Sequence, residues 1–218
     1  MNKWVESLLE YYRVGGWLPN GPPGVEYCDI MRAQHEIPLM VSAYQKGIRN
    51  YDVDKAYEAV KKTLTTQGTA LSSGGIVGNR HLDVYLKYGF VPYGEKSHHN
   101  VFGTTYEGPT SNTLEYAFDD WNAAQFAKAL GYEEDYDYKN VFDSETKYVR
   151  PKYSDGTWMP DFEPINKDEH STSWSWLGSG FVEGNSWQYT WMVPNDMNEL
   201  VKMIGREEFN RRLNEGFE

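Results

Sequence analysis

Cysteine, positive charge and long apolar runs are all scarce in this chain of 218 residues. The single cysteine, Cys28, excludes an internal disulfide framework and a zinc site built from several cysteines. No apolar run reaches the roughly 20 residues that cross a bilayer, and residues 1–10 do not resemble a secretory signal. With 32 acidic against 21 basic residues the formal net charge is −11, which disfavours a polyanionic partner. We therefore expect a soluble protein that binds neither nucleic acid nor membranes.

Signatures of several common enzyme classes are missing as well. The chain has no Gly-x-Ser-x-Gly elbow, no complete phosphate-binding loop, no zincin helix and no calcium-binding loop. The histidines are scattered, and the adjacent pair His98 and His99 would diverge on a regular element rather than chelate one ion. We therefore expect no metal site made from the residues of this chain alone.

Apolar residues recur at helical spacing along much of the chain, whereas strand-like alternation is scarce. The spacing predicts a first helix that ends at Gly15 and Gly16, and a third helix with Asp54 as its N-cap. The strongest helix is expected to start at Ser111 or Asn112 and to end at Gly131. Other helices are expected around residues 37–48, 82–88, 197–204 and 209–213, and residues 141–180 read mostly as loop. The fold class is therefore mainly α, with antiparallel helix pairs and long loops rich in aromatic residues.

Aromatic side chains are the outlier of the composition, with 8 Trp, 17 Tyr and 9 Phe. A large aromatic core explains many of them, but Trp174 and Trp176 lie in a Ser- and Gly-rich stretch typical of a functional loop. Flat rings stack on the apolar faces of sugars, and amides bind sugar hydroxyls. This composition favours a carbohydrate ligand.

The stretch from Phe181 to Trp191 places one carboxyl group, Glu183, beside glycine, two amides and two indoles. A carboxylic acid among apolar rings is poorly solvated when ionised and tends to keep its proton near neutrality. Glu183 is therefore a candidate general acid. The alternative is that it is a helix-start carboxylate near Asn185 without a catalytic role.

A second acidic cluster comprises Glu115, Asp119 and Asp120. Glu115 and Asp119 are four residues apart, so they share a helical face and repel each other unless a cation or ligand lies between them. A place in the first helical turn accounts for Glu115 alone, because a carboxylate there stabilises the helix dipole. The pattern leaves open a paired-carboxylate site that includes Glu183.

Several motifs taken in order resemble the α-mannosidases of glycoside hydrolase family 92, and they cover nearly the whole chain. They are Gly15-Gly16-Trp17-Leu18-Pro19, Met31 with His35, Ala43-Tyr44-Gln45-Lys46-Gly47-Ile48, Leu114-Glu115-Tyr116-Ala117-Phe118-Asp119-Asp120-Trp121, Asn140-Val141-Phe142-Asp143, Arg150-Pro151, Glu183 to Trp191, and Val193-Pro194-Asn195-Asp196.

The resemblance implies part of an (α/α)6 toroid that hydrolyses α-mannosidic linkages in glycans, with α-1,2 linkages expected, by an inverting mechanism that uses calcium. It places Glu183 at the position of the general acid. The other residues on motif positions near the site are Trp17, His35, Glu115, Asp120, Trp187 and Gln188. Members of the family are commonly periplasmic or secreted, but the sequence leaves the location of this protein open.

This chain also departs from the family pattern. The segments that supply the general base and most calcium ligands are absent, as is the N-terminal β-sandwich, and Ala33-Gln34 replaces the usual residues before His35. We therefore expect residues 1–218 to be a single partial catalytic domain that is nearly inactive alone. Helix faces without their usual neighbours would favour self-association. A non-catalytic sugar-binding helical module and a helical scaffold remain the alternatives.

Overall fold

The computed structural model describes residues 1–20, 27, 33–71, 76–95, 108–132, 139–165 and 180–217. These parts of the chain are mainly helical, which confirms the predicted class. The helices are α1 (Asn2–Gly15), α2 (Glu36–Gln45), α3 (Val53–Thr65), α4 (Leu82–Tyr88), α5 (Pro109–Leu130), α6 (Ser186–Tyr189), α7 (Met197–Ile204) and α8 (Arg206–Glu215), with a 3-10 turn at Lys139–Val141. Two antiparallel two-stranded sheets pair β1 (Thr69–Ala70) with β2 (Ile76–Val77) and β3 (Phe142–Asp143) with β4 (Tyr148–Val149).

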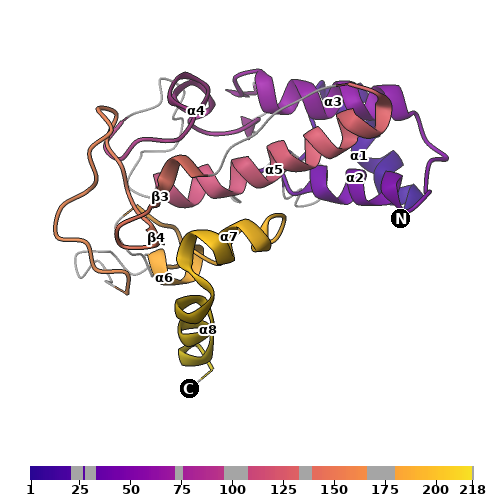
Figure 1. Cartoon of the computed structure of the whole chain (residues 1–218). Helices are drawn as coiled ribbons and strands as arrows, with labels where there is room; N and C mark the ends of the chain where they lie inside the picture. The colour runs from indigo at the N-terminus through magenta and orange to yellow at the C-terminus, as the bar shows by residue number, and fades with distance from the viewer. Residues whose placement is uncertain are drawn as a thin grey trace.

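Helix α5 runs through the middle of the molecule and has different neighbours at its two ends (Figure 1). Near its C-terminus, Phe126 belongs to an apolar cluster with α1, α2 and α3. Near its N-terminus, Leu114 and Ala117 belong to a second cluster with the β3–β4 hairpin, α7 and α8. Tyr116 packs into a third cluster with α4. One helix thus joins three cores.

The N-terminal body, formed by α1, α2 and α3, follows the pattern of an amphipathic helix layer. Val5 and Leu9 of α1, Met40 of α2 and Val60 of α3 are all fully buried in the cluster around Phe126. Burying each such side chain contributes about 1.5–3 kcal/mol. Apolar spacing alone accounts for this part of the fold.

The structure corrects two predicted helix starts. Asp52 rather than Asp54 is the N-cap of α3, and its carboxylate accepts the Lys55 backbone N–H at 2.9 Å. Helix α5 begins at Pro109, two residues before Ser111, because the fixed φ of proline suits the first helical position. The predicted ends are confirmed, since Gly16 and Gly131 adopt the left-handed conformation that closes α1 and α5.

The C-terminal region depends on polar side chains that bind loop backbones. Asp143 accepts hydrogen bonds from the Glu145 backbone N–H and the Thr146 hydroxyl, and forms an ion pair with Arg150 at 2.9 Å. Buried Arg212 on α8 donates to the Lys147 carbonyl at 2.7 Å. The hairpin turn and the last turn of α8 are therefore joined by this hydrogen bond, while α8 as a whole extends away from the body of α1, α2 and α3 (Figure 1).

Among the described residues, no helix combines the length and apolarity required to cross a bilayer.

Candidate active site

The loop that carries Glu183 is fixed onto the N-terminus of α5. The Thr110 backbone N–H donates to the Gly180 carbonyl at 3.0 Å, and the Val182 backbone N–H donates to the Ser111 hydroxyl at 3.2 Å. On the other side, the Tyr189 hydroxyl donates to the Val182 carbonyl at 2.8 Å. Three hydrogen bonds from two elements thus hold the residues just before Glu183.

Glu183 itself has a left-handed backbone with φ of 53° and an exposed side chain. Positive φ is uncommon for residues other than glycine and often marks a functional turn. The exposed side chain does not have the apolar shielding expected from the sequence. The ring of Trp187 packs edge-on against Trp191, with centroids 6.0 Å apart. Trp174 and Trp176 lie outside the described residues.

Helix α6 follows Glu183 and starts with a reciprocal capping box. The Asn185 side chain accepts the Gln188 backbone N–H, and the Gln188 side-chain oxygen accepts the Asn185 backbone N–H, both at 3.1 Å. Asn185 therefore caps this helix, a role that the sequence left open for Glu183. The oxygen of Gln188, a predicted substrate-binding residue, is engaged in the cap.

A second group of predicted residues forms where the start of α2 meets α5. The His35 Nε2 lies 2.6 Å from a carboxylate oxygen of Glu115, and the side chains are 51% and 13% exposed. The hydrogen bond that His35 donates to Glu115 raises the pKa of His35 above its usual value, although partial burial opposes the shift. The His35 ring meets Phe118 edge-on, and Phe118 stacks parallel to Trp121. Sequence alone placed His35 and Glu115 80 residues apart; the fold makes them neighbours.

The three carboxylates of α5 have three different protein partners. Glu115 binds His35, Asp119 accepts the Gln34 backbone N–H at 2.7 Å, and Asp120 accepts the Tyr85 hydroxyl at 2.7 Å. Asp119 is fully buried, and this burial raises its pKa to about 8. The repulsion expected between Glu115 and Asp119 persists, because the charge of Glu115 adds to the raised pKa of Asp119.

Trp17 is buried and is therefore not an open stacking platform. The ammonium of Lys62 lies 4.6 Å from the centroid of its ring and donates to the Gly16 carbonyl at 2.6 Å. A cation over an indole face is a favourable packing contact that occupies that face. A role for Trp17 in binding substrate remains a prediction.

Sequence reasoning missed the buried polar residues that surround these groups. Gln34 and Asn79 are almost fully buried, and Glu36 has a carboxylate oxygen that no solvent reaches. Asn79 closely follows Gly78, and Glu36 sits beside His35, but a single polar residue in a sequence carries no sign of burial. Only the tertiary structure reveals their burial.

The described residues include no group of three or more His, Cys, Asp or Glu side chains that could hold a metal ion. They therefore do not fit a calcium site, and no chemical step can be assigned to calcium from them.

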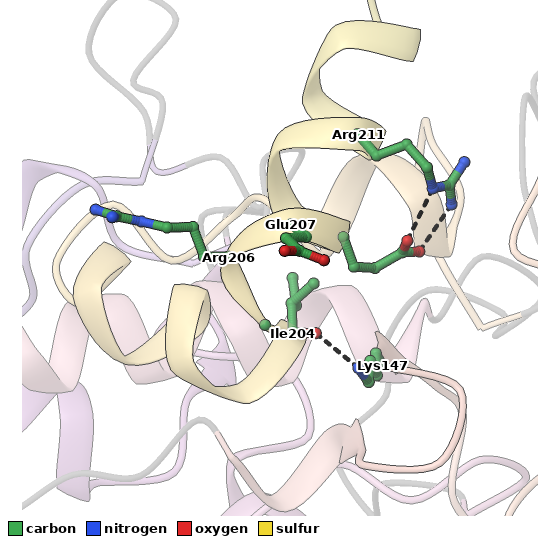
Figure 2. A pocket seen from close by; sticks show the side chains of 7 residues that line it. Lys147, Ile204, Arg206, Glu207 and Arg211 are labelled. Carbon is green, nitrogen blue, oxygen red and sulfur yellow. Dashed lines mark hydrogen bonds and ion pairs between the residues drawn. The ribbon is translucent and has the colours of Figure 1, made fainter.

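A cavity of about 540 Å³ lies at the corner between α7 and α8, and its lining includes Lys147, Ile204, Arg206, Glu207 and Arg211 (Figure 2). Lys147 donates to the Ile204 carbonyl, while Arg206 points away from the other lining residues (Figure 2). None of the predicted site residues lines this cavity. It is separate from the candidate active site.

The sequence model of the glycosyl hydrolase family 92 catalytic domain matches residues 1–218. The chain belongs to this family. The resemblance seen in the sequence motifs is thereby confirmed.

Solved structures of the family are similar in fold and sequence. A family 92 inverting mannosidase from Bacteroides thetaiotaomicron is 30% identical with a TM-score of 0.78, over 96% of this chain and 26% of that one. A family 92 α-mannosidase from the same organism, in complex with mannoimidazole, is 29% identical with a TM-score of 0.79, over 98% of this chain and 27% of that one.

A curated relative, described as an uncharacterized secreted glycosidase of Arthroderma benhamiae, is 27% identical over 94% of this chain and 29% of its own length. This family 92 chain thus spans between a quarter and a third of the length of these relatives.

Proposed function

We propose that the chain is part of the catalytic domain of an α-mannosidase that cleaves α-mannosidic linkages in glycans, with α-1,2 linkages the expected ones. The observation that carries this proposal is the similarity over 96–98% of the chain to two family 92 mannosidases. The loop of Glu183 supports it, because three hydrogen bonds anchor the residues before an exposed acid of unusual backbone conformation.

In the inverting mechanism we propose, Glu183 is the general acid and donates its proton to the glycosidic oxygen as the bond to the sugar breaks. A carboxylate base activates water on the opposite face, at a separation of about 6.5–9.5 Å between the two carboxyl groups. The exposed side chain of Glu183 leaves it free to approach a leaving group. The fixed backbone limits its motion, as a positioned acid requires.

We place the base and the calcium ligands in a part of the protein outside this chain, and we assign the chain to one segment of an (α/α)6 toroid. The two family 92 mannosidases are about four times as long, and the described residues do not fit a metal site. The isolated chain should therefore turn over substrate very slowly. The loss of one general acid or base typically costs about 10²–10⁴-fold in rate.

We also propose that the isolated chain self-associates through apolar side chains that lack a neighbour. Trp4 and Val14 on α1, Leu213 on α8 and Phe217 just beyond α8 are exposed. Apolar side chains that gather on a surface favour association. Light scattering that shows a monodisperse monomer at high concentration would contradict this proposal.

The decisive experiment measures mannose release from α-1,2-mannobiose with calcium, in the isolated chain and in the full-length protein. Glu183→Gln is compared with Glu163→Gln, which changes an exposed glutamate outside the site in the same way. In the full-length protein, Glu183→Gln should lower turnover about 10²–10⁴-fold, while Glu163→Gln leaves it unchanged. Equal turnover in both variants would show that Glu183 is not the general acid.

Mannose affinity without turnover in either protein would instead identify a sugar-binding module. A lack of both binding and turnover would favour a helical scaffold.

A further inference from the structure

Three consecutive residues at the start of α2 face the acidic side of α5. The Gln34 backbone N–H donates to an Asp119 carboxyl oxygen at 2.7 Å, and His35, the N-cap of α2, lies 2.6 Å from Glu115. Glu115 and Asp119 are one helical turn apart. A single turn of α5 therefore fixes both the backbone before His35 and the ring of His35 itself.

The buried polar atoms at this contact are short of hydrogen-bond donors. The second carboxyl oxygen of Asp119, the side-chain oxygen of Gln34 and one carboxyl oxygen of Glu36 are inaccessible to solvent and have no partner among the described residues. All three are acceptors while the carboxyls are ionised, so none can donate to another. A proton on a carboxyl converts one such oxygen into a donor. Protonation of one carboxyl group therefore supplies a hydrogen-bond donor that the ionised carboxylates lack.

The surroundings of Asp119 also favour its protonated, neutral form. The titratable groups that face it are His35 and Glu36 at the start of α2, Glu115 and Asp120 on α5, and Tyr85 on α4.

Burial raises the pKa of Asp119 to about 8, although the Gln34 N–H and His35 lower it. Burial also raises the pKa of Glu36 well above its usual value, and the charge of Asp119 adds to that shift. For Asp119, the effect of desolvation on the pKa thus outweighs the opposing effects of the Gln34 hydrogen bond and the His35 cation.

We propose that Asp119 is a positioning residue that acts as a neutral carboxylic acid: it anchors the backbone of Gln34 and thereby sets His35 against Glu115. An ionised Asp119 would compete with Glu115 for the proton of His35. A neutral Asp119 leaves the His35–Glu115 pair intact, with the imidazole half-exposed. A role of the His35–Glu115 pair beside a bound glycan rests on the proposed function. The positioning of His35 by Asp119 does not depend on it.

Thermal unfolding of the chain at different pH values tests the protonation state. A folded pKa above the unfolded value of about 3.9 gives a stabilisation that is complete below the unfolded pKa and is lost as the pH rises through the folded pKa. The midpoint of the wild type should therefore fall, relative to Asp119→Asn, by roughly 8–16 °C between about pH 5 and about pH 9. The amide copies the neutral acid, so the two proteins should unfold within a few degrees of each other at about pH 5.

Asp119→Leu is the matched control, because it keeps the branched shape of the side chain but removes the acceptor of the Gln34 N–H. It should unfold earlier than the wild type throughout the pH range. A constant difference between wild type and Asp119→Asn at all pH values would overturn the proposal. So would an Asp119→Asn protein as unstable as Asp119→Leu at about pH 5.

Titration of the His35 ring by NMR tests the positioning directly. The His35 signal is assigned by its absence from a His35→Asn protein. Its raised pKa should persist in Asp119→Asn and in Glu36→Gln, and should return toward about 6.5 in Asp119→Leu. A raised His35 pKa in Asp119→Leu would show that Asp119 does not place the ring. Neither measurement needs mannosidase activity, so a failure of the proposed function would leave this result unaffected.

Discussion

The two ends of α5 are held by different forces. At the C-terminal end, Phe126 packs into the apolar body of α1, α2 and α3, and Ala123 and Leu130 are partly buried against it. At the N-terminal end, successive polar residues are buried: Ser111, Asn112 and Thr113. The hydroxyls of Ser111 and Thr113 accept backbone N–H groups of loops that come from distant parts of the chain. Apolar packing builds the body, and polar side chains place the loops of the candidate site.

Hydrogen bonds from the N-terminal end show this division of roles. The Thr113 hydroxyl accepts the Val91 backbone N–H at 2.9 Å and donates to the Pro109 carbonyl at 2.8 Å. The Tyr116 hydroxyl donates to the Arg80 carbonyl at 2.7 Å. The Val91 N–H and the Arg80 carbonyl lie outside the helices and strands, so Thr113 and Tyr116 satisfy backbone groups in loops. The same end of α5 therefore organises the loops before α4, after α4 and before Glu183.

The largest expected effect is at the apolar end. Phe126→Ala should lower the free energy of unfolding by about 3–5 kcal/mol, because it removes a buried ring and leaves a cavity. Urea denaturation followed by tryptophan fluorescence measures this loss. Tyr132→Ala, which removes an exposed ring stacked on Tyr57, serves as the control and should cost far less. Similar losses for the two variants would show that Phe126 does not sit in a packed core.

At the polar end, Thr113→Val keeps the shape of the side chain but leaves the Val91 backbone N–H without an acceptor. We expect a loss of about 1–3 kcal/mol, the cost of one buried unsatisfied donor. Hydrogen exchange of the Val91 amide should also accelerate. Thr65→Val removes an exposed hydroxyl that binds its own helix, and it should be nearly neutral. An unchanged Val91 exchange rate would argue that this loop is held by packing.

A smaller effect on stability is expected at the N-terminus of α3, where the structure has Asp52 as the N-cap instead of the predicted Asp54. Asp52→Ala should destabilise the body by about 1 kcal/mol, because Asp52 caps the helix and accepts the Lys55 N–H. Asp54→Ala, in the first turn, should cost less because that residue only interacts with the helix dipole. The denaturant concentrations at which the two variants are half unfolded show which aspartate caps α3. A larger loss for Asp54→Ala would restore the N-cap predicted from the sequence.

The smallest effect on stability is expected at the half-exposed His35–Glu115 pair, where Glu115→Gln should cost less than about 1 kcal/mol. The folded pKa of His35 lies above its unfolded value, so this stabilisation is complete below about 6.5 and is lost as the pH rises through the folded pKa. NMR titration should show a lower His35 pKa in Glu115→Gln and no change in Asp120→Asn. Equal shifts in the two variants would mean that Glu115 is not the specific partner.

Sequence patterns predicted the body better than the site. Helical spacing identified α1, α2, α3 and α5, and the glycines that close α1 and α5 were located correctly. The ordered motifs indicated family 92, and the family match confirms it. The sequence also predicted that aromatic rings shield Glu183 from solvent. This prediction was wrong, because the Glu183 side chain is exposed.

The sequence by itself determined which segments are helical and which family the chain belongs to, because apolar periodicity and motif order are properties of neighbouring residues. Only the tertiary structure brought His35 to Glu115 and buried Asp119 beneath Gln34. The protonation state of a carboxyl depends on solvent and on charges that arrive from other elements. Those surroundings exist only after α2, α4 and α5 have packed together.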